Sequence, residues 1–324
     1  LNPVTINAGA VNSIVIRNAA LGAGAVVTTT SQAAGATVNL YAAGYDTFGN
    51  YIADQLAAWT STGLYTNNTL VQGTVSPFAF TATNKTSSGT LTATFSGKTA
   101  NVNPVTITAG AAASVVIRDA ASGGGTAPAN ATLTAGDTAN YYAATYDTYG
   151  NYIADASAAW TSANLFTNNI AVGGTTTTFG LTATNVTAAG TLTATIAGPF
   201  TDTLNPVTIN AGAVNSIVIR NAALGAGAVV TTTSQAAGAT VNLYAAGYDT
   251  FGNYIADQLA AWTSTGLYTN NILVQGTVSP FAFTATNKTT TGTLTATFSG
   301  KTANVNPVTI TAGAAASVVI RDAA

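Results

Sequence analysis

Apolar and polar residues alternate along much of the chain with a period of two. Leu91, Ala93 and Phe95, for example, alternate with threonines at positions 90, 92 and 94. A period of two places every second side chain on the same face of an extended strand, so one face is predicted to pack in a core while the other faces outward. Alanine is frequent, but threonine, valine, glycine and asparagine at this density disfavour a helix. The pattern therefore predicts an all-β protein.

The alternating pattern occurs in three consecutive repeats. Tryptophan marks them at Trp59, Trp160 and Trp262, which are 101 and 102 residues apart. A longer period lies on top of this one, because residues 1–121 match residues 204–324 at all but three positions. The full unit is therefore a pair of unlike domains, 203 residues long. The chain holds a non-integral number of these units, and we expect it to be a piece of a longer array.

Turn residues divide each repeat into about seven predicted strands. In the first repeat these strands fall at residues 11–18, 37–46, 56–61, 69–73, 77–84, 90–96 and 99–108. Short strands in this number and spacing predict tandem immunoglobulin-like β-sandwich domains. The predicted domains are residues 10–110, 111–212 and 213–313, with 1–9 as the final strand of a preceding domain and 314–324 as the first strand of a following one. The predicted structural core comprises the tryptophans and a row of phenylalanines: Trp59, Trp160, Trp262, Phe78, Phe80 and Phe95.

Two motifs resemble those of a known family. Tyr45-Asp-Thr-Phe-Gly-Asn50 leads from a predicted strand into a turn, Gly89-Thr-Leu-Thr-Ala-Thr94 lies in a later strand, and both recur in each repeat around the tryptophan strand, with Tyr149 in place of the turn phenylalanine in the second. This arrangement resembles the bacterial immunoglobulin-like domains of invasin- and intimin-type adhesins and other giant surface proteins. The resemblance implies an extracellular tandem stalk at the cell surface, which acts as a spacer.

The composition removes most enzyme chemistries. The chain has no His, Cys or Met, and its ten acidic residues are all aspartate. Without imidazole or thiolate groups there is no ordinary general base, thiol nucleophile or zinc site, so we do not expect an enzyme. A net charge of −2 without a basic cluster argues against nucleic-acid binding. No apolar stretch reaches the length of about 18 residues that a membrane-spanning helix needs.

The joints and the low charge together predict a structural role. Successive repeats are joined through the short segment 109–113, without a Pro/Ser-rich linker, so we expect a stiff rod. Since only 6% of residues are charged, the rods are predicted to associate side by side, with their own copies, with further repeats or with glycans. The expected function is a structural component of an extracellular fibre or stalk. The alternatives are a repetitive adhesin that binds a carbohydrate or a surface protein, and a filament subunit whose strand at residues 2–7 completes a sandwich in a neighbouring copy.

Two kinds of candidate site remain. Oxygen-bearing side chains surround the Asp-x-x-Gly-Asn turn, and they either bind calcium or cap the turn without a metal. These residues are Asp46, Asn50, Asp54, Asp147, Asn151, Asp155, Asp249, Asn253 and Asp257. No cofactor other than calcium is expected. Possible glycosylation sites are the Asn-x-Ser/Thr asparagines Asn67, Asn84, Asn130, Asn185 and Asn287, of which the ones at 84, 185 and 287 occupy equivalent turns.

Overall fold

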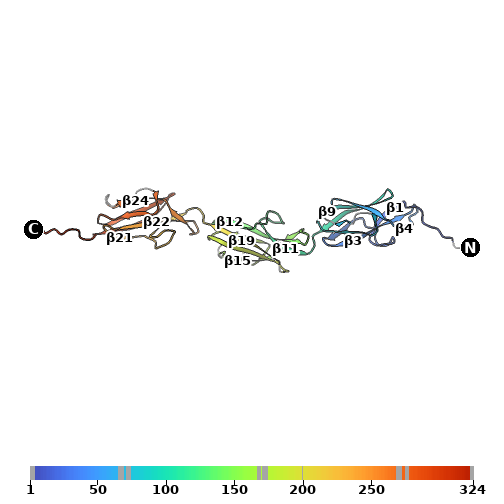
Figure 1. Ribbon diagram of the computed structural model, residues 1–324, viewed down its shortest axis with the longest axis horizontal. Helices are drawn as coiled ribbons and strands as arrows, with labels where there is room; N and C mark the ends of the chain where they lie inside the picture. Colours follow the sequence, from blue (N-terminus) through green and yellow to red (C-terminus); the bar gives the residue numbers. More distant parts are fainter. Residues whose placement is uncertain are drawn as a thin grey trace.

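The chain folds into a row of β-sandwiches. The computed structural model describes residues 4–64, 69–70, 74–165, 169, 174–198, 200–267, 272–273 and 277–321. Over these residues it contains strands and no α-helix, and the strands form three sandwiches in line, with the chain ends at opposite ends of the row (Figure 1). The predicted all-β fold is therefore confirmed. Within the same ranges, no helix is long and apolar enough to cross a membrane.

The first domain consists of two sheets. One sheet has the order β1 (Ser13–Arg17), β3 (Thr37–Tyr45), β8 (Phe78–Thr81) and β6 (Thr69–Leu70), and β4 (Tyr51–Asp54) also pairs with β3. The other has the order β2 (Thr30–Ala33), β10 (Lys98–Thr108), β9 (Thr86–Phe95), β5 (Ala57–Thr62) and β7 (Thr74–Val75). β2 runs parallel to β10, whereas the other ladders are antiparallel. This strand order is that of an immunoglobulin-like sandwich, as predicted. β2 adds a parallel strand at the edge of one sheet.

The other two domains repeat this arrangement, except that the described residues of the second include no counterpart of β6. The second contains β11 (Ala112–Arg118), β12 (Ala131–Thr134), β13 (Thr138–Asp147), β14 (Tyr152–Asp155), β15 (Ala158–Ala163), β16 (Gly174–Thr176), β17 (Thr178–Thr182), β18 (Thr187–Thr195) and β19 (Thr201–Asn210). The third contains β20 (Ser216–Arg220), β21 (Thr233–Ala236), β22 (Thr240–Tyr248), β23 (Tyr254–Gln258), β24 (Ala260–Thr265), β25 (Ile272–Leu273), β26 (Thr277–Val278), β27 (Phe281–Thr284), β28 (Thr289–Phe298) and β29 (Lys301–Thr311).

Each domain has its own hydrophobic core between its two sheets. In the first, Trp59 from β5 stacks on Phe78 from β8, with ring centroids 4.3 Å apart, and Phe80 lies fully buried beside them. The tryptophans of the other domains occupy the same place on β15 and β24 and are equally buried. Phe95 is half-buried and packs against the edge of the first cluster. Because the three clusters have no residue in common, each sandwich is stabilised by its own packing.

Three strands of the first domain, β2, β4 and the two-residue β7, did not follow from the alternation. β2 has the sequence Thr-Ser-Gln-Ala, which lacks large apolar residues, and backbone hydrogen bonds to β10 hold it at the sheet edge. β4 has the sequence Tyr-Ile-Ala-Asp, in which apolar residues are adjacent. It follows the turn after β3 and pairs antiparallel with that strand. An edge strand needs only one paired side, so its side chains need not alternate.

Short segments at the two ends lie outside the strands. Residues 4–12 and 312–321 are not in strands, and Ile6 and Ile320 are 88% and 94% exposed. In β10 the counterpart of Ile6 is Ile107, which is 1% exposed. The assignment of the end segments to sandwiches of neighbouring domains stays a prediction.

Candidate functional site at the interdomain joints

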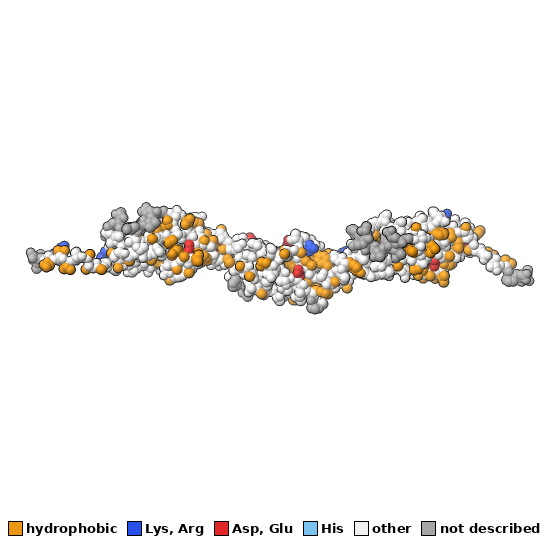
Figure 2. All heavy atoms as spheres, in the orientation of Figure 1, with side chains coloured by type: hydrophobic (Ala, Val, Ile, Leu, Met, Phe, Trp, Pro, Cys, Tyr) orange, Lys and Arg blue, Asp and Glu red, His pale blue; other side chains and the backbone are white. Residues whose placement is uncertain are grey.

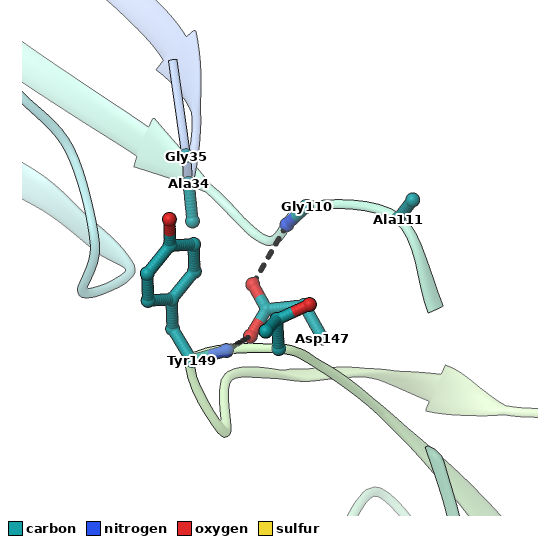
Figure 3. Close-up of a pocket in the computed structure, with 7 residues that line it drawn as sticks. Ala34, Gly35, Gly110, Ala111, Asp147 and Tyr149 are labelled. Carbon is teal, nitrogen blue, oxygen red and sulfur yellow. Dashed lines mark hydrogen bonds between the residues drawn. The ribbon is translucent and has the colours of Figure 1, made fainter. Parts of the chain in front are cut away.

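The joint between the first and second domains is organised by the carboxylate of Asp147, which is buried at the end of β13 (Figure 3). Its Oδ2 accepts hydrogen bonds from Gly110 N and Asn151 Nδ2, both at 2.8 Å. Its Oδ1 accepts hydrogen bonds from Tyr149 N and Asn151 N, both at 2.9 Å. Since Gly110 belongs to the linker after β10, one carboxylate connects the linker to the turn of the next domain.

The local sequence explains this turn. An Asp side chain readily accepts hydrogen bonds from N–H groups two and four residues further on, which closes a tight turn. Gly150 has a φ of 80°, a conformation that glycine adopts without strain, and its N–H also donates to the carbonyl of Asp147. Asp-Thr-Tyr-Gly-Asn is therefore a preformed acceptor to which the linker can bind.

Asn151 connects the turn directly to the preceding domain. Its Nδ2 donates to the carbonyl of Thr83 at 2.7 Å, and its Oδ1 accepts from the backbone N–H of Lys85 at 2.9 Å. Both partners lie in the loop between β8 and β9 of the first domain. The Lys85 ammonium also donates to the carbonyl of Tyr152 at 3.2 Å and lies 6.0 Å from its ring centroid. We call the contacts of Asp147 and Asn151, and their equivalents at the second joint, the joint clasp.

Tyr149 fills the other side of the joint. Its ring stands against Gly35 of the first domain, where a Cβ atom would lie 3.3 Å from the ring (Figure 3). Gly110 is equally confined, because a Cβ there would lie 2.8 Å from the carbonyl oxygen of Ala34. These residues border a hollow of about 280 Å³. Glycine at position 35 lets the Tyr149 ring of the second domain lie this close, whereas Gly110 lets the linker pass close to the first domain's own backbone.

The clasp recurs at the second joint. Asp249 accepts from Gly212 N at 2.9 Å, and Asn253 donates to the carbonyl of Thr184 at 2.6 Å. Asn253 Oδ1 accepts from the backbone N–H of Val186 at 3.2 Å. Valine at the position of Lys85 keeps the backbone hydrogen bond and omits the ammonium. The two joints therefore share their backbone contacts and differ in side chains, since Val186 replaces Lys85 and Phe251 replaces Tyr149.

The first domain shows the same turn without a clasped neighbour. Asp46 accepts from Gly9 N at 3.1 Å and from Asn50 Nδ2 at 2.9 Å. Among the described residues, Asn50 makes no hydrogen bond to another domain. Phe48, the equivalent of Tyr149, is 89% exposed, against 46% for Tyr149. The preceding domain is therefore what covers this aromatic residue in a joint.

The structure divides the calcium candidates into separate sets. Asp46 and Asn50 lie together, but the amide nitrogen of Asn50 donates to the Asp46 carboxylate. The amide oxygen of Asn50 therefore does not face the position where a cation beside that carboxylate would lie. Asp54 instead accepts from Leu21 N at 2.7 Å, and Asp155 and Asp257 do the same in their own domains. In the described part of the chain, no three acidic residues gather in a way that could hold a metal ion. Calcium binding stays a prediction, whereas the hydrogen-bonding role is observed.

The sequon asparagines lie in different surroundings. Asn84, Asn185 and Asn287 are half-buried, and the first two lie in the loops that the clasps hold. Asn130 is exposed just before β12, and Asn67 lies outside the described residues. Their glycosylation stays a prediction.

Sequence reasoning missed the asparagine that supports one clasped loop. Asn169 is fully buried, and its Oδ1 accepts from Thr184 N at 2.6 Å and from Asn185 N at 2.8 Å. Its Nδ2 donates to the carbonyl of Asn185 at 3.2 Å. The available signal was an Asn-Asn pair that recurs at residues 67–68, 168–169 and 270–271.

The clasp carboxylates have lowered pKa values. For Asp147, burial is the largest influence and raises the pKa, but the hydrogen bonds from Asn151, Gly110 and Tyr149 together outweigh it and lower it. The pKa of Asp249 is lowered in the same way, because its hydrogen bonds outweigh the effect of burial. For Asp46, the hydrogen bond from the Asn50 side chain is the largest influence, and the pKa falls from 3.8 to about 2.

We expect the joints to open in acid. A group whose pKa is lower in the folded state contributes stability above its unfolded pKa, and this contribution is lost as the pH falls through the folded value. The clasps should therefore hold at neutral pH and loosen as the pH falls below the ordinary aspartate value of 3.8, because the pKa values of Asp147 and Asp249 are lowered from it. Because the chain has no cysteine, spin labels at Lys98→Cys and Thr161→Cys, on exposed sites of adjacent domains, can report the width of the interdomain distance distribution.

Tryptophan fluorescence at each pH serves as the control for unfolding of the sandwiches. A distribution that stays equally narrow to the acid limit, or that broadens well above pH 3.8, would contradict the role given to the carboxylates.

The chain matches no protein-family model and no curated protein sequence. Solved structures with a similar fold include FdeC, an Escherichia coli adhesin, with 15% identity, 94% of this chain and 99% of that chain covered, and a TM-score of 0.49. InvD of Yersinia pseudotuberculosis has 17% identity, 86% and 95% coverage and a TM-score of 0.40. Invasin, a bacterial integrin-binding protein, has 19% identity, 89% and 59% coverage and a TM-score of 0.38. Similarity of this degree concerns the fold alone, so what those proteins bind is not carried over to this chain.

Proposed function

We propose that this chain is a stiff segment of an extracellular stalk or fibre, in which successive sandwiches are held end to end at a fixed angle. The observation that carries the proposal is the joint clasp, which recurs at both joints with the same backbone contacts. A flexible string of domains would not need a buried aspartate that bonds its own turn to the linker, or a half-buried asparagine that bonds the same turn to the preceding domain. The turn and strand motifs that resemble bacterial surface repeats support the extracellular location.

The composition supports a mechanical role over a catalytic one. The whole sequence lacks His, Cys and Glu. The polar groups of the joint hydrogen-bond to one another, so they are already occupied by structural partners. A clasp of this kind transmits bending and pulling forces from one domain to the next, because its partners lie in both domains.

Removing the clasp asparagines should make the rod flexible. In Asn151→Ala with Asn253→Ala, each joint loses hydrogen bonds that cost about 1–3 kcal/mol when unmade. The ratio of open to closed joints should then rise at least about fivefold. Small-angle X-ray scattering should show a shorter mean maximum dimension, and spin labels at positions 98 and 161 should show a broader distance distribution.

Asn50→Ala is the matched control, because Asn50 bonds its own turn but no other domain within the described residues. It should leave the scattering profile unchanged. The proposal fails if the double variant is as extended and as narrowly distributed as the wild type, or if the wild type is itself flexible.

We further propose that these rods associate laterally with copies of themselves. The chain has 8 basic and 10 acidic residues in 324, and Figure 2 shows few charged side chains scattered over a surface of apolar and uncharged ones. Dense surface charge is what normally keeps soluble domains apart. Without it, neighbouring rods can approach closely, so concentration-dependent association is expected in sedimentation experiments.

A further inference from the structure

The first and third domains each expose a group of apolar side chains that the second domain lacks. In the first domain Leu21, Val26 and Leu56 are 79%, 50% and 59% exposed. The third domain repeats the group with almost the same exposure, in Leu224, Val229 and Leu259. The second domain has Ser122, Ala127 and Ser157 at these positions. We call each group of three the leucine patch.

The loop that carries Leu21 is held rigidly. Leu21 N donates to Asp54 Oδ2 at 2.7 Å, and Arg17 donates to the carbonyl of Gly24 at 2.7 Å. Gly22 lies so close to the ring of Tyr51 that a Cβ atom would be 2.5 Å from it. Leu56 follows two residues after Asp54, so the backbone of both leucines lies close to the Asp54 contact. A rigid loop cannot fold back to bury its apolar tip, and it loses little entropy on binding.

The backbone of the loop is left-handed at Leu21, and the side chain is exposed. Leu21 and Leu224 both have a φ of 59°, in the left-handed region, where a bulky residue costs about 1–2 kcal/mol. Ser122 has a φ of 60° at the same place in the second domain. Leucine gains nothing from packing inside its own domain, because about four-fifths of its surface is exposed. Because Ser122 adopts the same φ, the conformation belongs to the loop, and in the first and third domains this loop holds a leucine side chain out of its own core.

The patch spacing matches a second copy of this chain. Leu21 and Leu224, and likewise Leu56 and Leu259, are 203 residues apart, the length of the two-domain unit. One patch of three side chains is too small by itself, since a stable interface needs about 800 Å² on each partner. Two rods that lie side by side bring several patches together at once, and each contact raises the effective concentration of the next. A second copy of the chain carries its own patches at the same spacing, so both patches of one rod can meet those of the other.

We infer that the leucine patches of the odd-numbered domains are the lateral contacts between copies of this chain. This inference rests on the lateral association proposed above. The contact recurs once in each two-domain unit, so the second domain acts as a spacer between contacts. The sparse surface charge leaves little repulsion between the rods.

The test replaces the patch leucines with the residues that the second domain already uses. The variant Leu21→Ser, Leu56→Ser, Leu224→Ser and Leu259→Ser is compared with the wild type by sedimentation velocity over a range of concentrations. We expect the wild type to associate and the variant to associate at least about tenfold more weakly. Leu21→Ser with Leu56→Ser alone should lose most of the association, because the two patches act together.

Phe48→Ser is the matched control, since Phe48 is 89% exposed and lies outside both the patches and the two joints. It should associate like the wild type. The gain-of-contact variant Ser122→Leu with Ser157→Leu should associate more strongly. Thermal unfolding of each variant establishes that the sandwiches are intact.

The outcomes separate the two proposals. If the quadruple variant associates as strongly as the wild type, the patch inference is overturned while lateral association stands. If the wild type stays monomeric at every concentration, both are overturned. The stiffness of the joints is tested independently by the asparagine variants.

Discussion

Phe80→Ala is expected to unfold the first domain at a temperature about 20 °C lower while the third domain keeps its own midpoint. Phe80 is fully buried in β8, within a core cluster that includes no residue of another domain. Replacing a buried phenylalanine by alanine costs about 3–5 kcal/mol, since the domain loses apolar burial and retains a cavity. In a domain of about 100 residues, each kcal/mol shifts the midpoint by about 4–8 °C.

The near-identity of the first and third domains makes this experiment specific. Phe283 is the counterpart of Phe80 and is also fully buried, so the two domains should melt together in the wild type. Calorimetry should show that Phe80→Ala separates one transition from the other. Phe48→Ala is the control, because Phe48 is 89% exposed. A joint decrease of both domains would show that the sandwiches are not independent units of stability.

The fold was predictable because its main signals are local. Alternation over four to ten residues was sufficient to predict β9, where Leu91 and Ala93 are buried and the intervening threonines are half-exposed. The recurrence of tryptophan marked the same buried position in each domain. β2, β4 and β7 were missed because hydrogen bonds to a neighbouring strand hold them, and they are too short or too irregular in sequence to show a periodic pattern.

The joint clasp was only half predictable. Asp147 and Asn151 could be assigned to a turn, since their mutual hydrogen bonds span four residues. Their other partners, Gly110 and Thr83, lie 37 and 68 residues away in the sequence. A local motif contains no information about such distant contacts.

The exposed leucine was also beyond local rules. Sequence patterns treat an apolar residue beside glycines as either core or incidental, and Leu21 is neither. Its left-handed backbone and its fixed position relative to Asp54 are properties of the folded loop. Comparing the two kinds of domain could have drawn attention to it, because both patch leucines change to serine together in the second domain.

Asp147→Asn is expected to destabilise the second domain by about 2–4 kcal/mol and to loosen the first joint. Asparagine has nearly the same shape, and its oxygen can still accept from the N–H groups of Tyr149 and Asn151. Its amino group then faces Gly110 N and Asn151 Nδ2, which are both donors. If the amide of the new asparagine is rotated by 180°, its amino group instead faces the N–H groups of Tyr149 and Asn151, which are also donors. Unfolding by denaturant, followed through tryptophan fluorescence, measures the stability, and the labels at positions 98 and 161 report the joint.

Asp137→Asn removes the same charge from an exposed turn of the same domain, where Asp137 accepts from Thr134 N. We expect a loss below about 1 kcal/mol there, because water can replace the contact. If the two variants were equally stable and equally ordered at the joint, the carboxylate of Asp147 would not be the group that organises it.

The exchange variant Asp147→Asn with Asn151→Asp separates the turn from the joint. It restores a donor–acceptor pair between positions 147 and 151, and the new carboxylate can still accept from the backbone N–H of Lys85. The carbonyl of Thr83 then faces an acceptor, and Gly110 N still faces an amino group. The stability of the domain should therefore recover in part, while the interdomain distance distribution stays broad. Recovery of a narrow distribution would mean that the linker and the preceding domain contribute nothing to the fixed angle, and the stiff-stalk proposal would lose its physical basis.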